Sequence, residues 1–185
     1  MRVKESISSW LEKRLLLKVN ESKSAVDRIW RRSFLGYTFL PGASARIKIS
    51  GKSLARFKAK AKRLLRMGKG RNLGRFIREE LTPFVRGWTD YYRLCETREF
   101  AKALDGWLRR HLRKVIWRQA KRAPRRYRLL RSRGLGEEQS WRSVTNGRGP
   151  WWNSGAQHMN QAFPKSYFTA LGLVSILDRL NYWKS

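Results

Sequence analysis

The segment from Asp105 to Arg128, DGWLRRHLRKVIWRQAKRAPRRYR, constrains the fold of this chain more than any other. It contains ten Lys or Arg, three large aromatic residues and a single acidic residue, at its first position. Residues spaced three or four apart share one face of an α-helix. A row of residues with this spacing begins slightly upstream of the segment and comprises Phe100, Leu104, Leu108, His111 and Val115. The pattern predicts a helical rod with one packed side and one cationic side.

The limits of this helix are predicted from its flanking residues. Thr97, followed by Glu99 in the first turn, indicates an N-cap, and Pro124 predicts an end near Arg122 because proline cannot continue a helix. At 1.5 Å per residue the helix would be about 35–40 Å long. A second face, away from the packed one, is expected to carry Arg110, Lys114, Arg118 and Lys121.

The charge of the whole chain is extreme. Its 185 residues carry a formal net charge of +30, yet 41% of them are hydrophobic and nine are Trp, which argues for a folded core rather than a disordered basic tail. Residues 28–78 contain sixteen Lys or Arg and no acid, and residues 106–136 contain twelve more and again no acid. A merely solvated surface would mix both signs. The distribution therefore predicts a polyanionic partner.

The remaining elements are also mostly helical. Ile7, Trp10, Leu11 and Leu15 predict a helix over 4–20, and β-branched and aromatic residues predict a hairpin of strands 33–40 and 45–50 with a turn at 41–44. A further helix is expected from Ser53 to the glycines at 68 and 70. The fold class expected is mainly α, with an N-terminal helix and β-hairpin followed by a helical bundle and short C-terminal helices.

The helices after residue 80 are predicted from caps and breakers. Thr82 and Pro83 indicate an N-cap and first helical position, with Trp88 and Tyr92 on the apolar side of that helix. Beyond Pro124 we expect a helix from 137 to 146, a loop over 147–155 and a helix from 164 to 172. The apolar stripes also predict that Trp88, Tyr91, Tyr92 and Trp107 are core residues, and that the lone Cys95 is buried and inert.

Nothing in the sequence points to catalysis by this chain. Members of the neighbouring pairs Glu79–Glu80 and Glu137–Glu138 project about 100° apart on a helix, so neither pair makes an acid–base couple. His111 and His158 have no Cys or acid at metal-ligand spacing. We therefore expect no catalytic residue, no metal site and no cofactor. A single Cys, the lack of a signal peptide and the lack of a long apolar run predict a cytoplasmic protein without a membrane partner.

Basic residues interleaved with aromatic ones are typical of proteins that bind RNA, because unpaired bases stack on aromatic planes while cations contact phosphates. Two interpretations of Trp151 and Trp152 stay open: they fill a groove between helices, or one of them stacks on RNA. The residues that we expect to contact RNA are Lys58, Lys62, Arg63, Arg66, Arg71, Arg110, Arg113, Lys114, Arg118, Lys121, Arg122, Arg125, Arg126, Arg128, Arg148 and Trp151.

Several stretches resemble group II intron reverse transcriptases. LLLKVNESKSAVDRIWRRSFLGYTF is similar to the end of their palm region. FIREELTPFVRGWTDYYRLCET, LDGWLRRHLRKVIWRQAKR, and NGRGPWW with the later YFTALGLVSILDRL are similar to the thumb and maturase-specific region (domain X) of bacterial members. The resemblance implies three parts: a palm remnant over 1–50, a thumb-like helical bundle over 51–122 and a maturase-specific extension over 123–185. The end of the sequence is similar to that of family members that lack an endonuclease module.

The resemblance implies binding of group II intron RNA, and stabilisation of that RNA for splicing and mobility. By position, Lys23 matches a palm lysine near the incoming nucleotide, and Phe34, Leu35 and Gly36 match the motif that closes the palm. The YxDD box with its metal-binding aspartates has no counterpart here, so the chain is not expected to be catalytic alone. Mg²⁺ is expected for the family's polymerase and for the intron ribozyme.

Two other functions remain as alternatives. The chain could be a subunit that completes a split RNA-directed DNA polymerase by joining a separate fingers–palm polypeptide and gripping the template–primer duplex. It could also be a general RNA chaperone or a ribosome-associated protein, although the nine Trp and the family motifs argue against that.

Overall fold

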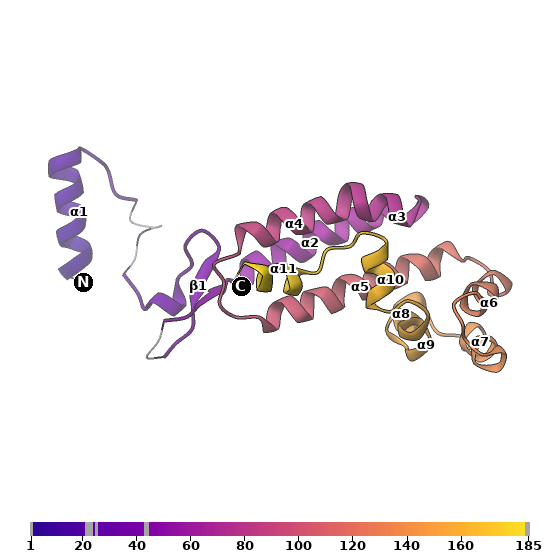
Figure 1. The fold of residues 1–185 in the computed structure, drawn as a ribbon. Helices are drawn as coiled ribbons and strands as arrows, with labels where there is room; N and C mark the ends of the chain where they lie inside the picture. Colours follow the sequence, from indigo (N-terminus) through magenta and orange to yellow (C-terminus); the bar gives the residue numbers. More distant parts are fainter. Residues whose placement is uncertain (1, 21–23, 25, 43–44, 184–185) are drawn as a thin grey trace.

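The computed structural model describes residues 2–20, 24, 26–42 and 45–183, and the predicted fold class, mainly α, is confirmed. The helices α2, α4 and α5 run along an elongated body, with α6 to α9 at one end and the hairpin and α1 at the other (Figure 1). Lys23 lies outside the described residues, as does part of the predicted turn at 41–44. The side chains of the three long helices therefore line the length of one elongated body.

The N-terminal part contains α1 (Arg2–Leu15), a short 3-10 turn η1 (Ile29–Arg31) and the strands β1 (Tyr37–Phe39) and β2 (Ile47–Ile49). The strands pair antiparallel, with Tyr37 opposite Ile49, so the predicted hairpin is confirmed with shorter strands. Its inner side packs on the bundle in a small cluster with Tyr92 and Cys95. Cys95 is fully buried there, as predicted.

Helix α2 (Gly51–Met67) starts where Ser50 caps it by accepting a hydrogen bond from the Ser53 amide. Its buried positions Phe57, Ala61 and Leu65 are spaced by four residues and belong to the main apolar core. The helix ends at Gly68, as predicted, and continues into the 3-10 turn η2 (Gly68–Gly70). Every basic residue of α2 is therefore left on the solvent side.

The prediction of a helix start at Thr82 is wrong. Helix α3 (Leu73–Phe76), the π-helical turn η3 (Ile77–Leu81) and α4 (Thr82–Tyr91) follow one another without a break, and Asn72 caps the run. The Thr82 hydroxyl instead donates to the Gly172 carbonyl oxygen at 2.7 Å. Pro83 has no N–H, and the wider turn of η3 just before it accommodates its ring.

Helix α5 (Glu99–Gln119) is the long helix that the sequence predicts, but both of its ends differ. Its N-cap is Arg98 without a side-chain cap, and the Thr97 hydroxyl lies 3.4 Å from the Cys95 sulfur instead. The helix stops three residues early because Pro124 already belongs to the first turn of α6 (Ala123–Arg131). With 21 residues, α5 is about 31 Å long.

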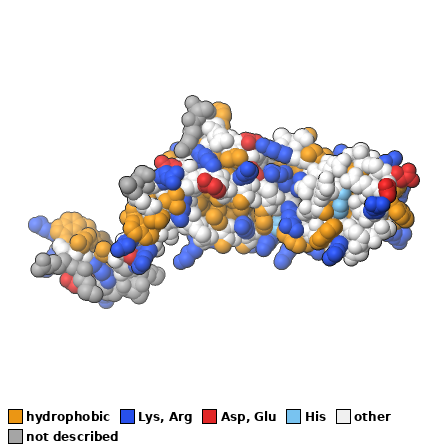
Figure 2. Space-filling model, turned by 90° about the horizontal axis from the view of Figure 1, so that it is seen from below, with side chains coloured by type: hydrophobic (Ala, Val, Ile, Leu, Met, Phe, Trp, Pro, Cys, Tyr) orange, Lys and Arg blue, Asp and Glu red, His pale blue; other side chains and the backbone are white. Residues whose placement is uncertain are grey.

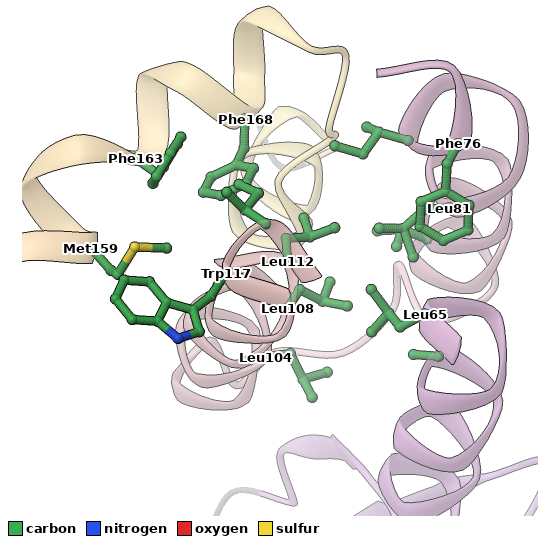
Figure 3. Close-up of a cluster of buried hydrophobic side chains, with 14 of the residues drawn as sticks. Leu65, Phe76, Leu81, Leu104, Leu108, Leu112, Trp117, Met159, Phe163 and Phe168 are labelled. Atoms are coloured by element: carbon green, nitrogen blue, oxygen red, sulfur yellow. The ribbon is translucent and has the colours of Figure 1, made fainter. Parts of the chain in front are cut away.

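The core surrounds α5 on several sides. In Figure 3 Leu108 and Leu112 of α5 point toward Leu65 of α2 and Leu81 of η3. Trp117, at the end of α5, lies beside side chains from the C-terminal helices, and this second group comprises Met159, Phe163 and Phe168. One continuous core therefore joins the residues before and after 122, although the three-part division of the chain stays a prediction.

The C-terminal helices are α7 (Glu137–Val144), α8 (Pro150–Gly155), α9 (Gln157–Ala162), α10 (Lys165–Ala170) and α11 (Ile176–Tyr182). The predictions of α7 and α10 are confirmed, whereas the loop predicted over 147–155 contains α8. Its Pro150 occupies the first helical turn, where the missing N–H is not needed. The buried Asp105 of α5 accepts hydrogen bonds from Ser175 and from the first amides of α11, which anchors the end of the chain.

Candidate nucleic-acid interface

A groove of about 540 Å³ opens between α2, η2, α5 and α8. We call it the basic groove. It forms because α5 packs against α8 on one side and against η2 on the other. Lys and Arg side chains outnumber Asp and Glu over the face seen in Figure 2. The side chains that line the groove are Lys62, Leu65, Arg66, Lys69, Trp107, His111, Lys114, Val115, Arg118 and Trp151.

Five cations form the rim of this groove. Lys62 and Arg66 are one turn apart on α2, Lys69 follows on η2, and Lys114 and Arg118 are one turn apart on α5. None of the residues that line the groove is acidic. Burial lowers the pKa of Lys114, and the neighbouring cations, first of all Arg118, lower it further. The rim therefore carries positive charge that no acidic side chain among the described residues neutralises, as an anion site requires.

The uncharged side chains that line the groove are mostly aromatic, and the Lys114 ammonium nitrogen lies over one of these rings, 5.5 Å from the centroid of Trp151. The rings of Trp107 and His111 have centroids 4.2 Å apart, and His111 and Trp151 are 5.0 Å apart. Burial, followed by the charges of Lys114, Lys62 and Arg110, lowers the pKa of His111 to about 4. Its imidazole is neutral at pH 7 as a result, and its Nε2 atom has no hydrogen-bond partner in the described part of the chain.

Arg110 is not part of the rim, although the sequence places it in one row with Lys114 and Arg118. Its guanidinium carbon lies 4.1 Å from the centroid of the Trp151 ring, and it donates to the Trp151 carbonyl oxygen at 3.3 Å. A side chain added at Gly155 would come within 2.9 Å of that guanidinium. Arg110 therefore holds α8 against α5.

Arg113 and Arg126 also serve the fold. Arg113 is buried and donates to the Phe163 carbonyl oxygen at 3.0 Å, and burial lowers its pKa to about 10. Arg126 donates to the Ala120 carbonyl oxygen at 2.7 Å and lies over the Trp117 ring. The structure thus does not support Arg113 as a phosphate ligand, because α9 and α10 cover it.

The other predicted RNA contacts lie at the surface but not together. Lys58 and Arg63 are exposed on α2, and Arg71 forms an ion pair with Glu80. Arg148 lies over the Trp152 ring, away from the basic groove. A separate exposed group at the junction of α5 and α6 comprises Lys121, Arg122, Arg125 and Arg128.

For Trp151 the structure confirms packing between helices, whereas stacking on RNA stays a prediction. Trp151 packs against His111 and Arg110 between α8 and α5, yet 42% of it stays exposed in the groove. Trp107 is half-buried, so it packs on the core and also lines the groove. The prediction that Tyr91 is a core residue is wrong, since its ring is exposed and its hydroxyl donates to the Leu35 carbonyl oxygen.

Besides two aliphatic residues, three residues that line the groove were not among the predicted contacts: Lys69, Trp107 and His111. Lys69 lies between the two glycines that end α2, where helical periodicity no longer indicates a direction. His111 and Trp107 follow the apolar face of α5, which indicates core. Basic residues on both sides of the apolar face of α5 are the signal that could have identified Trp107 and His111 as groove residues.

The described acidic side chains do not fit a magnesium site. No group of three or more His, Cys, Asp or Glu is placed to hold a metal ion in the part of the chain that the structure covers. Glu79 pairs with Arg75, and Asp90 with Arg179, whose hydrogen bond lowers the pKa of Asp90. These carboxylates are occupied by protein cations, so no step of a polymerase reaction is assigned to them.

One comparison with known families finds a match over part of the chain. Residues 54–134 match the group II intron, maturase-specific domain. The matched segment runs from α2 to α6 and contains all five rim cations, whereas Trp151 of α8 lies beyond it. The match indicates a maturase role in group II intron splicing, with intron RNA as the partner.

The matched segment also crosses the predicted boundary between 122 and 123. It takes in most of the part expected to be thumb-like and the first residues of the predicted extension. No curated protein matches the chain. Among the described helices, none is long and apolar enough to cross a bilayer.

Proposed function

We propose that this chain binds group II intron RNA through the basic groove and stabilises the folded RNA for splicing and mobility. The observation that carries the proposal is the convergence of five cations on one groove that no acid lines. Each phosphate that such a cation neutralises releases counterions from the RNA, which provides affinity that falls as salt is added. The maturase match over the same helices supports intron RNA as the polyanion.

The arrangement of the rim fits an RNA backbone. Lys62 and Arg66 stand on the α2 side, and Lys114 and Arg118 stand on the α5 side, so a strand laid along the groove meets cations on both sides. Both helices are held by the same apolar core, so the two rows keep a fixed separation. A rigid pair of rows favours one RNA shape over others, and a maturase that stabilises a folded intron needs that selectivity.

The test compares the affinity for a group II intron RNA with that for an unrelated structured RNA of equal length. Both are measured at about 150 mM salt and again at higher salt. We expect a preference of about a hundredfold, or roughly 3 kcal/mol, that persists at high salt. Equal affinities that fall together would contradict the proposal and leave only a general cationic grip.

A second candidate rests on a separate observation at the N-terminus. Large apolar side chains are exposed on α1 and on the segment after it, among them Trp10, Leu16 and Phe34. Such a surface is typical of a protein interface. We propose that it docks a separate fingers–palm polypeptide, whose own carboxylates would carry polymerase chemistry while this chain grips the template–primer duplex.

Mixing the two polypeptides tests this second candidate. We expect a stable complex on size exclusion and DNA synthesis on a primed RNA template only from the mixture. The replacement of Trp10 and Leu16 by Ser should abolish the complex and leave the helical content of this chain unchanged. Synthesis that is equally fast without this chain would count against the candidate.

A further inference from the structure

We infer that the basic groove binds one unpaired nucleotide of the RNA, with its base against the floor of Trp107, His111 and Trp151. The phosphates on either side of that nucleotide would lie on the cations of the rim. This inference deepens the proposed function and rests on it, because it names the RNA feature that the same groove recognises.

The composition of the floor is the first argument. A site for phosphate alone needs cations and amides, but this groove has three adjacent rings below its charges. His111 is neutral at pH 7, so it offers a flat ring instead of a further positive charge. Neutral aromatic rings bind the faces of bases by stacking, with little regard to sequence.

The size of the groove is the second argument. A volume of about 540 Å³ is on the scale of sites that hold one small organic ligand. In a duplex both faces of each base are covered by its neighbours, and only the edges are accessible. A paired stem can therefore rest on the rim but cannot reach the floor. A nucleotide that is bulged out of a stem, or that belongs to a loop, can do so.

Trp151 is also held in place before any ligand arrives. Arg110 lies over its ring and binds its carbonyl oxygen, and His111 packs beside it. A ring that is already ordered loses little conformational entropy on stacking. The next residue, Trp152, is exposed to a similar degree but lines a different cavity with Asn146 and His158. It is a matched control one position away.

The experiment uses the full chain and three RNA hairpins with the same stem. One stem carries a single bulged nucleotide, one carries the same bulge without its base, and one is fully paired. Dissociation constants are measured at about 150 mM salt for the wild type and for W151L, W151F and W152L. We expect the wild type to bind the bulged base about tenfold more tightly than the abasic bulge, equivalent to about 1.4 kcal/mol.

W151L should remove this preference, W151F should keep part of it because the ring remains, and W152L should keep all of it. Equal binding of the base-bearing and abasic bulges by the wild type would overturn the inference. So would an equal loss of preference in W152L and W151L. If W151L fails to fold, the comparison of W151F with W152L decides the question by itself.

The two proposals fail separately. A preference for the bulged base without any preference for intron RNA would sink the proposed function and leave the nucleotide site standing. A preference for intron RNA with equal binding of both bulges would support the proposed function and overturn the nucleotide site.

Discussion

Asp105 shows how one buried carboxylate fixes the end of the chain. It is 6% exposed and accepts hydrogen bonds from the Ser175 hydroxyl and from the amides of Ile176 and Leu177. Its negative charge also lies at the positive end of α11, which is favourable. No protein cation shares this carboxylate among the described contacts. The amides of Ile176 and Leu177 depend on it, whereas the Asp178 amide donates to the Ser175 hydroxyl.

We expect Asp105→Asn to lower the free energy of unfolding by about 1–3 kcal/mol. The Asn side chain has no negative charge, and its NH₂ group faces the donors that Asp105 accepts from. Those donors then remain unsatisfied. Urea unfolding measures the change. Lys165→Gln is the matched control, because the ion pair of Lys165 with Asp178 is solvent-exposed and worth about 0–1 kcal/mol. An equal loss in both variants would contradict this role of Asp105.

His111 makes stability depend on pH in a defined direction. Its folded-state pKa of about 4 lies below the value of about 6.5 for an unfolded chain, so the unfolded chain binds the proton first. Stability is therefore lost as the pH falls from 6.5 towards 4, and it is fully present above that window. Burial also lowers the pKa of His158, which acts in the same direction.

Thermal unfolding at pH 7, 6 and 5 tests this. We expect the melting temperature of the wild type to fall by several degrees over that range. His111→Gln should reduce the fall, and a double variant that also carries His158→Gln should reduce it further. An identical fall in the wild type and the double variant would assign the acid sensitivity to other groups.

The sequence identifies cationic residues better than it identifies what each one does. Helical spacing puts Arg110, Lys114 and Arg118 in one row, and α5 does carry all three on neighbouring faces. Which of them reaches solvent is decided by α8, some forty residues later in the chain, because Trp151 takes up Arg110. Long flexible side chains choose partners that periodicity along one helix cannot reveal.

At the scale of the element, α5 offers a matched pair of charges. Arg110→Gln should loosen α8 and lower stability by about 1 kcal/mol, since a cation–π contact and a hydrogen bond are lost. Arg118→Gln should leave stability unchanged or slightly higher, because it relieves repulsion with Lys114 one turn away. For RNA binding we expect the opposite order, with the larger loss of affinity in the Arg118 variant. The slope of the logarithm of RNA affinity against the logarithm of salt concentration should fall by the amount of about one phosphate contact.

Urea unfolding and salt-dependent RNA titrations of both variants provide the comparison. An Arg110 variant that folds as well as the wild type but loses the larger part of RNA affinity would show that Arg110 belongs to the rim. It would also remove the argument that Trp151 is ordered before binding.

The helices themselves were predictable where local chemistry decides them. Periodic apolar residues and glycine stops located α2, and the acidic first turn located α7. Thr82 and Thr97 misled because both look like caps, yet the Thr82 hydroxyl binds Gly172, ninety residues away. The π-helical turn η3 precedes Pro83 directly, but a proline indicates only a break in the helical hydrogen bonds and not the kind of turn that bridges it.

At the scale of the whole molecule, the N-terminal part is the least anchored. Figure 1 shows α1 apart from the bundle, and its apolar residues Ile7, Trp10 and Leu15 are largely exposed. We expect its amides to exchange hydrogen fastest and those of α5, whose Leu108 and Leu112 are fully buried, to exchange slowest. Mass spectrometry of the exchanged protein measures both, and equal early protection of α1 and α5 would contradict the prediction.

The net charge of +30 should make salt act in opposite directions on folding and on RNA binding. In the free protein the rim cations repel one another across the basic groove. Burial is the main reason that the pKa of Lys114 is lowered, and the other four rim cations lower it further. Salt screens that repulsion, so the melting temperature should rise by several degrees between about 50 and 500 mM NaCl, while the affinity for RNA falls steeply.

A double variant, Lys62→Gln with Lys114→Gln, removes one cation from each side of the groove. It should melt higher than the wild type at low salt, gain less from added salt and bind RNA with a shallower salt slope. A melting temperature that does not respond to salt in the wild type would mean that the repulsion is already relieved within the protein. The groove would then lack the unneutralised charge on which the proposed RNA binding depends. An anion that binds between mutually repelling cations stabilises the folded protein, because it relieves their repulsion.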